Sequence, residues 1–109
     1  MVDSNLPTFL LISKHSPENC PSFNEKAKNT FINAFDKSEE LAAKHNVKMV
    51  GSWTIPTEHV YYMIFDAPSL EAFNDFSMEP DILAMAAFHT AEVKIVTNLE
   101  EKVKKLKNN

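Results

Sequence analysis

The single cysteine and two of the histidines have side chains suited to a transition-metal site. His15 follows the apolar run Phe9–Ser13, and Cys20 comes shortly after it in the segment HSPENC. His89 lies far along the chain, just before the segment AEVKIV. Imidazole nitrogen and thiolate sulfur are good ligands for Zn²⁺ and for copper. We therefore predict a Zn or Cu site at His15, Cys20 and His89, provided that the fold brings them together.

The same residues also have other uses. A cysteine in a core is commonly a small buried hydrophobe. Cys20 also precedes a predicted helix, whose dipole lowers the pKa of a thiol, and His15 would assist such a reactive thiol. Met78, Met85 and Phe88 precede His89. An apolar pocket and an axial histidine are the minimum requirement for a haem site, and these residues would supply both. Ordinary core packing is the alternative reading of these apolar residues.

A second group of polar and aromatic residues surrounds a predicted β-hairpin. Trp53 and His59 flank its turn, and Tyr61 and Tyr62 follow. If these side chains face an apolar interior, they form the kind of pocket that binds small molecules. His59 would then be a general base near neutral pH, and Trp53, Tyr61 and Tyr62 would contact the ligand. The alternative is a core tryptophan and a solvated histidine.

Two registers of this hairpin remain open. With a four-residue loop, Thr54 is expected opposite His59, and Trp53 opposite Val60. A shift of one residue would place Trp53 and His59 on the same face, because side chains alternate along a strand.

Composition excludes several classes of function. The net charge is −4, and the 11 basic residues are all lysine, so the sequence has no arginine. Because arginine is the usual reader of phosphates and guanine edges, nucleic acid is not an expected partner. A chain with one glycine contains neither a P-loop nor a dinucleotide fingerprint. The start of the chain lacks the pattern of a signal peptide, and no apolar run is long enough for a membrane span, so we expect a cytoplasmic protein.

Hydrophobic periodicity and turn residues predict alternating strands and helices. Ser22 and Glu25 fit a capping box at the start of the first helix. Asn46 suits its end, and Pro80 and Asn98 suit the starts of later helices. The expected strands are 9–13, 47–55, 59–65 and 89–96, and the expected helices are 22–46, 69–76, 79–87 and 98–107.

This order, β-α-β-β-α-β with a C-terminal helix, is the ferredoxin-like α+β pattern. We expect one domain over 1–109, with its core at about 8–97. The usual spatial order of the strands is 4-1-3-2, with the helices on one face. Strand 1 then pairs antiparallel with strand 4, which brings His15 and His89 to the same edge of the sheet.

The strands predict that the second face of the sheet is covered as well. Phe9 and Leu11 lie on one face of the first strand, and Leu10 and Ile12 lie on the other. A sheet with one face in water would show alternation of apolar and polar residues. We therefore expect a homodimer that packs sheet against sheet into a barrel. A monomer with an internal ligand groove, or with the C-terminal helix folded back, is the alternative.

Two segments resemble a known family. The segment MVGSWTIPTEHVYYMIFDAPSLEAF (49–73), with Ser-Trp late in the second strand, and the segment AEVKIV (91–96) are similar to small domains of the dimeric α+β-barrel superfamily. The resemblance covers about residues 8–97 and points to an uncharacterised family within that superfamily. It implies the fold and the dimer. The superfamily includes cofactor-independent monooxygenases, isomerases and haem enzymes, so no catalytic residue is carried over.

Three functional hypotheses follow. The first is a transition-metal site, Zn or Cu, at His15, Cys20 and His89. The second is a cofactor-independent monooxygenase or isomerase that acts on a small apolar or aromatic compound, with His59 as base. The third is a non-catalytic binder of a small ligand or haem.

Overall fold

The computed structural model describes residues 6–108, and the polar start Met1–Asn5 lies outside them. Two short 3₁₀ turns lie in the connections between elements: η1 (Pro17–Asn19) follows the first strand, and η2 (Pro56–Glu58) joins the second strand to the third. The other elements are β1 (Thr8–Lys14), α1 (Glu25–Ala43), β2 (Lys48–Ile55), β3 (Val60–Asp66), α2 (Leu70–Ser77), α3 (Pro80–Ala86), β4 (Thr90–Val96) and α4 (Leu99–Lys107).

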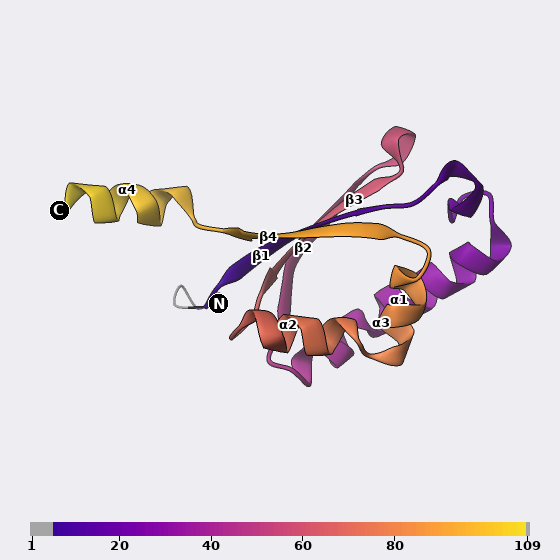
Figure 1. Ribbon diagram of the computed structural model, residues 1–109, viewed down its shortest axis with the longest axis horizontal. Helices are drawn as coiled ribbons and strands as arrows, with labels where there is room; N and C mark the ends of the chain where they lie inside the picture. Colours follow the sequence, from indigo (N-terminus) through magenta and orange to yellow (C-terminus); the bar gives the residue numbers. More distant parts are fainter. Residues whose placement is uncertain (1–5, 109) are drawn as a thin grey trace.

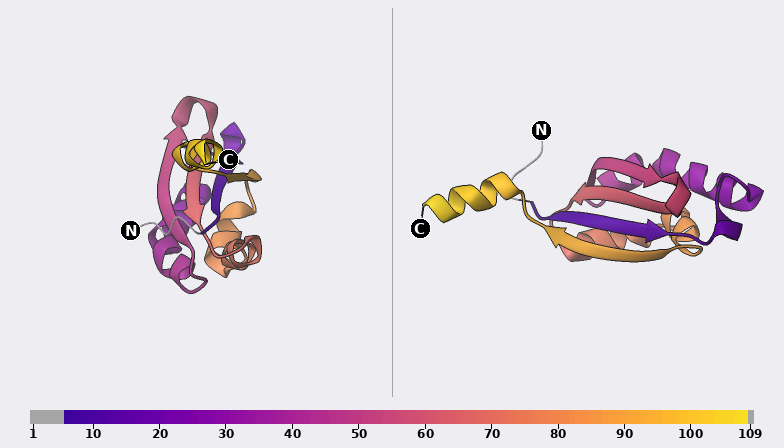
Figure 2. Two further views of the ribbon diagram at one scale, coloured as in Figure 1. Left: turned by 90° about the vertical axis from the view of Figure 1, so that its left-hand side faces the viewer. Right: turned by 90° about the horizontal axis from the view of Figure 1, so that it is seen from above.

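The strands form one antiparallel sheet in the order β2-β3-β1-β4, which is the predicted order read from its other end (Figure 1). Helices α1, α2 and α3 lie on one face of this sheet, and Figure 2 shows the opposite face without a helix. The predicted ferredoxin-like α+β architecture is therefore confirmed.

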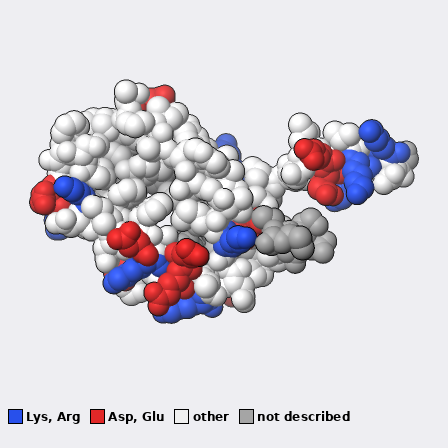
Figure 3. Space-filling view, turned by 180° about the vertical axis from the view of Figure 1, so that it is seen from behind, with Lys and Arg blue, Asp and Glu red and all other residues white. Residues whose placement is uncertain are grey.

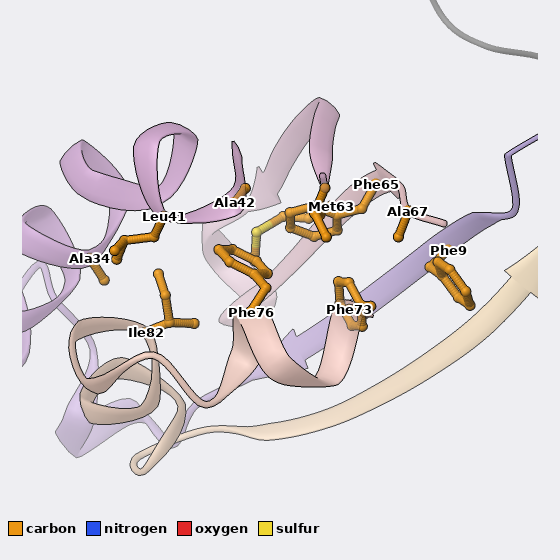
Figure 4. Close-up of a cluster of buried hydrophobic side chains, with 11 residues drawn as sticks. Phe9, Ala34, Leu41, Ala42, Met63, Phe65, Ala67, Phe73, Phe76 and Ile82 are labelled. Carbon is orange, nitrogen blue, oxygen red and sulfur yellow. The ribbon is translucent and has the colours of Figure 1, made fainter. Parts of the chain in front are cut away.

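The core lies between these helices and the sheet (Figure 4). Phe9 of β1 and Phe65 of β3 point toward Phe73 of α2, with ring centroids 5.5 and 5.1 Å from the Phe73 ring. All three rings are almost completely buried. Removing such a side chain from water stabilises the fold by about 1.5–3 kcal/mol, so these aromatic contacts fix α2 against the sheet.

The start of α1 differs from the prediction. Asn24, not Ser22, caps the helix, because its side chain accepts a hydrogen bond from the Ala27 amide at 3.0 Å. The amides of Phe23 and Asn24 both donate to the Cys20 carbonyl at 2.9 Å. That turn places Ser22 outside the helix. Sequence patterns predict such caps to within a few residues only.

The hairpin takes neither predicted register. Ile55 pairs with Val60, and Trp53 pairs with Tyr62. The turn consists of η2 and His59, which adopts the left-handed conformation at φ 55° and ψ 41°. A bulge at Val50 shifts the earlier part of β2 by one residue. Trp53 therefore faces away from the helices.

Trp53 folds back over the glycine that precedes it on the same face of β2. A Cβ atom added at Gly51 would lie 2.5 Å from Cη2 of the Trp53 ring. We predict that Gly51→Ala displaces this indole and changes the fluorescence of the only tryptophan. Because Trp53 is 60% exposed, the ring can move, and the loss of stability should stay below about 1 kcal/mol. Emission spectra and urea unfolding of the variant test both points, and an unchanged spectrum would contradict the first.

The face of the sheet without helices carries a band of partly exposed apolar residues. Leu10 and Ile12 of β1 lie beside Tyr62 and Ile64 of β3 in the ladder. The band ends at β4, whose residues on this face include Glu92 and Lys94. The predicted apolar character of both faces is thus confirmed for the inner strands β1 and β3, from which it was inferred, and it does not extend to β4.

Helix α4 extends away from the body of the molecule (Figure 1). Its cap is Asn98, as predicted, since this side chain accepts from the Glu101 amide at 3.1 Å. Leu99, Val103 and Leu106 are all exposed on it. In the view of Figure 3, charged side chains gather on α4 and along the lower border of the body, and the area above that border is largely uncharged. Within residues 6–108 no helix combines the length and apolar character needed to cross a bilayer.

Candidate metal centre and cavity

One end of the sheet brings His15 and His59 together. β1 and β3 pair antiparallel, with Lys14 opposite Val60. His15 follows Lys14 and His59 precedes Val60, so the two histidines come next to each other at this end of the ladder. The His15 amide donates to the His59 carbonyl at 3.2 Å, which extends the ladder by one bond. The two imidazole centroids lie 5.3 Å apart.

Cys20 returns to these histidines through the turn that follows β1. The 3₁₀ turn η1 ends at Cys20, whose amide donates to the Pro17 carbonyl at 3.2 Å. One ligand atom each from His15, Cys20 and His59 lies within 4.8 Å of the other two. His15 and Cys20 are buried, and His59 is half-buried.

His89 joins these three residues in one cluster of side chains, although it is not one of the three close ligands. Its ring centroid is 5.2 Å from that of His15, with the rings almost perpendicular. Its Nδ1 lies 2.8 Å from the Met85 carbonyl, so Nδ1 carries the proton and Nε2 has a free lone pair. The centroid of the Phe88 ring lies 4.3 Å from that of the His89 ring, with 41° between their planes. Met78 of the haem hypothesis is 63% exposed.

Several buried nitrogens in this cluster have no hydrogen-bond partner among the described residues. They are both ring nitrogens of His15, Nδ1 of His59 and Nε2 of His89. Buried polar atoms in native proteins are almost always hydrogen-bonded, and leaving one unpaired costs about 1–3 kcal/mol. Four such nitrogens lie close together here, and water or a bound ligand would satisfy them.

Burial favours the neutral form of His15 and of His89. Desolvation lowers the pKa of His15 below its ordinary value of 6.5, and the nearby His89 and His59 lower it further. Desolvation also lowers the pKa of His89, and the Met85 carbonyl offsets part of that effect. The pKa of Tyr61 is raised by burial and then by the Cys20 thiolate. A neutral imidazole is the form that binds a metal ion.

These shifts predict that the metal-free protein loses stability in mild acid. The unfolded chain binds protons on its histidines near pH 6.5, whereas folded His15 and His89 resist protonation. The free energy of unfolding should therefore fall as the pH drops below about 6.5. Urea unfolding of chelator-treated protein at several pH values tests this. The fall should be smaller in His89→Gln, and an equal fall in both proteins would contradict the assignment.

The cluster occupies one end of a cavity of about 590 Å³ between the sheet and the helices. This cavity lies on the face of the sheet that packs against α1, α2 and α3. Its apolar lining includes Leu11, Phe31, Phe35, Met49, Met63 and Met85.

The structure separates the residues that the sequence grouped around the hairpin. Tyr61 lines the cavity, and its ring lies 5.4 Å from that of His15. Tyr62 points to the other face, as does Trp53, which only borders the cavity from the edge strand. His59 is in the cluster, and its link to His15 and Cys20 was not predicted. Correct counting of the β1–β3 pairing would have found it.

Solved structures similar to this chain share its topology. A Nipsnap family protein with unknown function from Agrobacterium tumefaciens superposes with a TM-score of 0.54 at 17% identity, over 85% of this chain and 88% of that chain. SnoaB, a cofactor-independent oxygenase from Streptomyces nogalater, superposes with a TM-score of 0.52 at 18% identity, over 84% of this chain and 91% of that chain. No protein-family model and no curated protein matches the sequence.

Likenesses at this level of identity concern the fold, and fold alone does not assign an activity. The strand order, the helices on one face and both superpositions agree with the resemblance in segments 49–73 and 91–96. The chain therefore has a ferredoxin-like α+β fold, which it shares with these solved structures.

Proposed function

We propose that the protein binds one divalent transition-metal ion per subunit through His15, Cys20 and His59. The observation that carries this proposal is the approach of three ligand atoms, from segment 15–20 and from the hairpin turn, to within 4.8 Å of one another. Ligand atoms around a tetrahedral Zn²⁺ ion lie about 3.5 Å apart. Side-chain movements that shift each ligand atom by about 1 Å would therefore bring the three atoms to the spacing of a zinc site. Copper suits the same ligands.

His89 supports this site as a positioning residue. Its ring packs edge-on against the ring of His15, so it limits how that imidazole can turn. The bond from its own Nδ1 to Met85 in turn fixes His89. Such outer contacts orient the ligands of metal sites. This ligand set differs from the one expected from the sequence, which had His89 in place of His59.

Metal content measured on protein made without a histidine tag tests the proposal. Mass spectrometry should find about one Zn or Cu per subunit, and Cys20→Ser should lose most of it. His45→Ala is the matched control, since His45 bonds Glu79 at 2.7 Å, away from the cluster. A metal-free protein that also fails to take up added Zn²⁺ or copper would refute the proposal. Equal metal loss in His45→Ala would do the same.

We also propose that two copies pair through the face without helices. Leu10, Ile12, Tyr62 and Ile64 are only half-buried there in one chain, and Trp53 is 60% exposed. Removing this band from water favours association, because apolar burial contributes about 25 cal/mol per Å². A second copy supplies a matching band through a twofold axis.

A second candidate function is oxygenation of a small aromatic compound without metal. It is favoured by the cavity of about 590 Å³ and by the likeness to SnoaB, which is itself a cofactor-independent oxygenase. His59, at one end of the cavity, would remove a proton from the substrate. Such activity should persist after chelation and disappear in His59→Ala. Loss of activity on chelation would favour the metal site instead.

A further inference from the structure

We propose that the cavity takes a flat, apolar organic compound with one acidic hydroxyl or thiol group, which binds to the metal ion as a monoanion. This inference rests on the proposed metal site and names the class of ligand that the site accepts. It follows from the number of ligands, from the charge of the site and from the shape and chemistry of the lining.

The number of protein ligands leaves a position for this compound. His15, Cys20 and His59 supply three donor atoms, and a tetrahedral ion takes four. All three residues line the cavity. An ion held by them therefore borders the cavity, and the fourth donor can arrive from that side.

Charge selects an anionic donor. A divalent ion bound by one thiolate and two neutral imidazoles keeps one net positive charge. Among the described residues that line the cavity, none is Asp, Glu or Lys. An unpaired charge in such a place is unfavourable. A phenol, enol or thiol that releases its proton to solvent as its oxygen or sulfur binds the ion removes this charge.

The lining selects the rest of the compound. The Phe31 ring stacks on the Tyr61 ring at 5.0 Å and 13° between their planes, and Phe35 lies 6.1 Å from Phe31. Every titratable group of the lining is in the cluster or is Tyr61, so the remainder of the cavity offers no charge to a ligand. A volume of about 590 Å³ suits a fused-ring compound.

Titration with β-naphthol and with its methyl ether tests the inference. The two probes share the fused rings, and only the naphthol has a proton to lose. Calorimetry should show that Zn²⁺-loaded protein binds β-naphthol at least about tenfold more tightly than chelated protein does. The methyl ether should bind both forms equally. A naphthol affinity that does not respond to the metal would overturn the inference.

A pair of variants on α1 tests the location. Phe35 lines the cavity and is 48% exposed, whereas Ile32 is 46% exposed on the same helix and does not line it. Phe35→Ala should weaken both probes about equally and leave Zn²⁺ binding intact, and Ile32→Ala should change neither. Equal effects of the two variants would overturn the placement. Failure of the protein to bind Zn²⁺ at all refutes the metal site instead, so the two proposals fail separately.

Discussion

Replacement of His15 by alanine is expected to lower the affinity for Zn²⁺ by at least about a hundredfold. Replacing a residue that only hydrogen-bonds a metal ligand already lowers metal affinity by up to about that factor, and loss of a ligand should cost more. The same replacement should leave the stability of the metal-free protein unchanged or slightly higher. Both ring nitrogens of His15 are buried without a hydrogen-bond partner in residues 6–108, so alanine removes a destabilising group. Competition with a chromophoric chelator measures the affinity, and urea unfolding measures the stability.

His45→Ala provides the contrasting result. This side chain bonds Glu79 at 2.7 Å between the end of α1 and the start of α3. Its loss should cost about 1 kcal/mol of stability and leave Zn²⁺ affinity as it was. If His15→Ala behaves like His45→Ala in both measurements, His15 is an ordinary core residue.

The second large effect concerns assembly. Ile64→Asp is expected to convert the proposed dimer to a monomer, because the change would place one carboxylate from each copy in the interface. Ile64 lies on the face without helices and is half-buried in a single chain, so aspartate is tolerated in the monomer. An unpaired buried charge costs several kcal/mol, which is enough to dissociate a dimer at micromolar concentration. Light scattering across a dilution series measures the mass.

Leu83→Asp is the matched substitution on the other side of the molecule. Leu83 is 43% exposed on α3, in the helix layer. The variant should remain a dimer. A monomeric wild-type protein, or a dimer that survives Ile64→Asp, would show that a different surface pairs or that none does.

The fold was largely predictable because local signals and topology agree. The strands and helices have distinct hydrophobic periods, and the order β-α-β-β-α-β leaves few arrangements open. The pairing of β1 with β4 was correctly expected to bring His15 near His89. That part of the candidate site needed only the order of the strands.

The rest of the site depended on details that the sequence does not settle. The loop before β3 uses a 3₁₀ turn and one left-handed residue, and the bulge at Val50 lies outside any simple alternation. An error of one residue in such a hairpin moves every side chain to the other face. The sequence therefore left open whether His59 shares a face with Trp53, and it gave no sign that His59 lies against His15, where the structure places it.

At position 59 the residue that would give the greatest stability differs from the residue that the proposed metal site needs. At φ 55° an L-residue is strained relative to glycine by about 1 kcal/mol, although histidine tolerates this region better than most. Glycine would relax the turn and delete the imidazole. A selection for thermal stability that ignores activity should therefore enrich glycine at position 59, and a selection that demands the site should restore histidine.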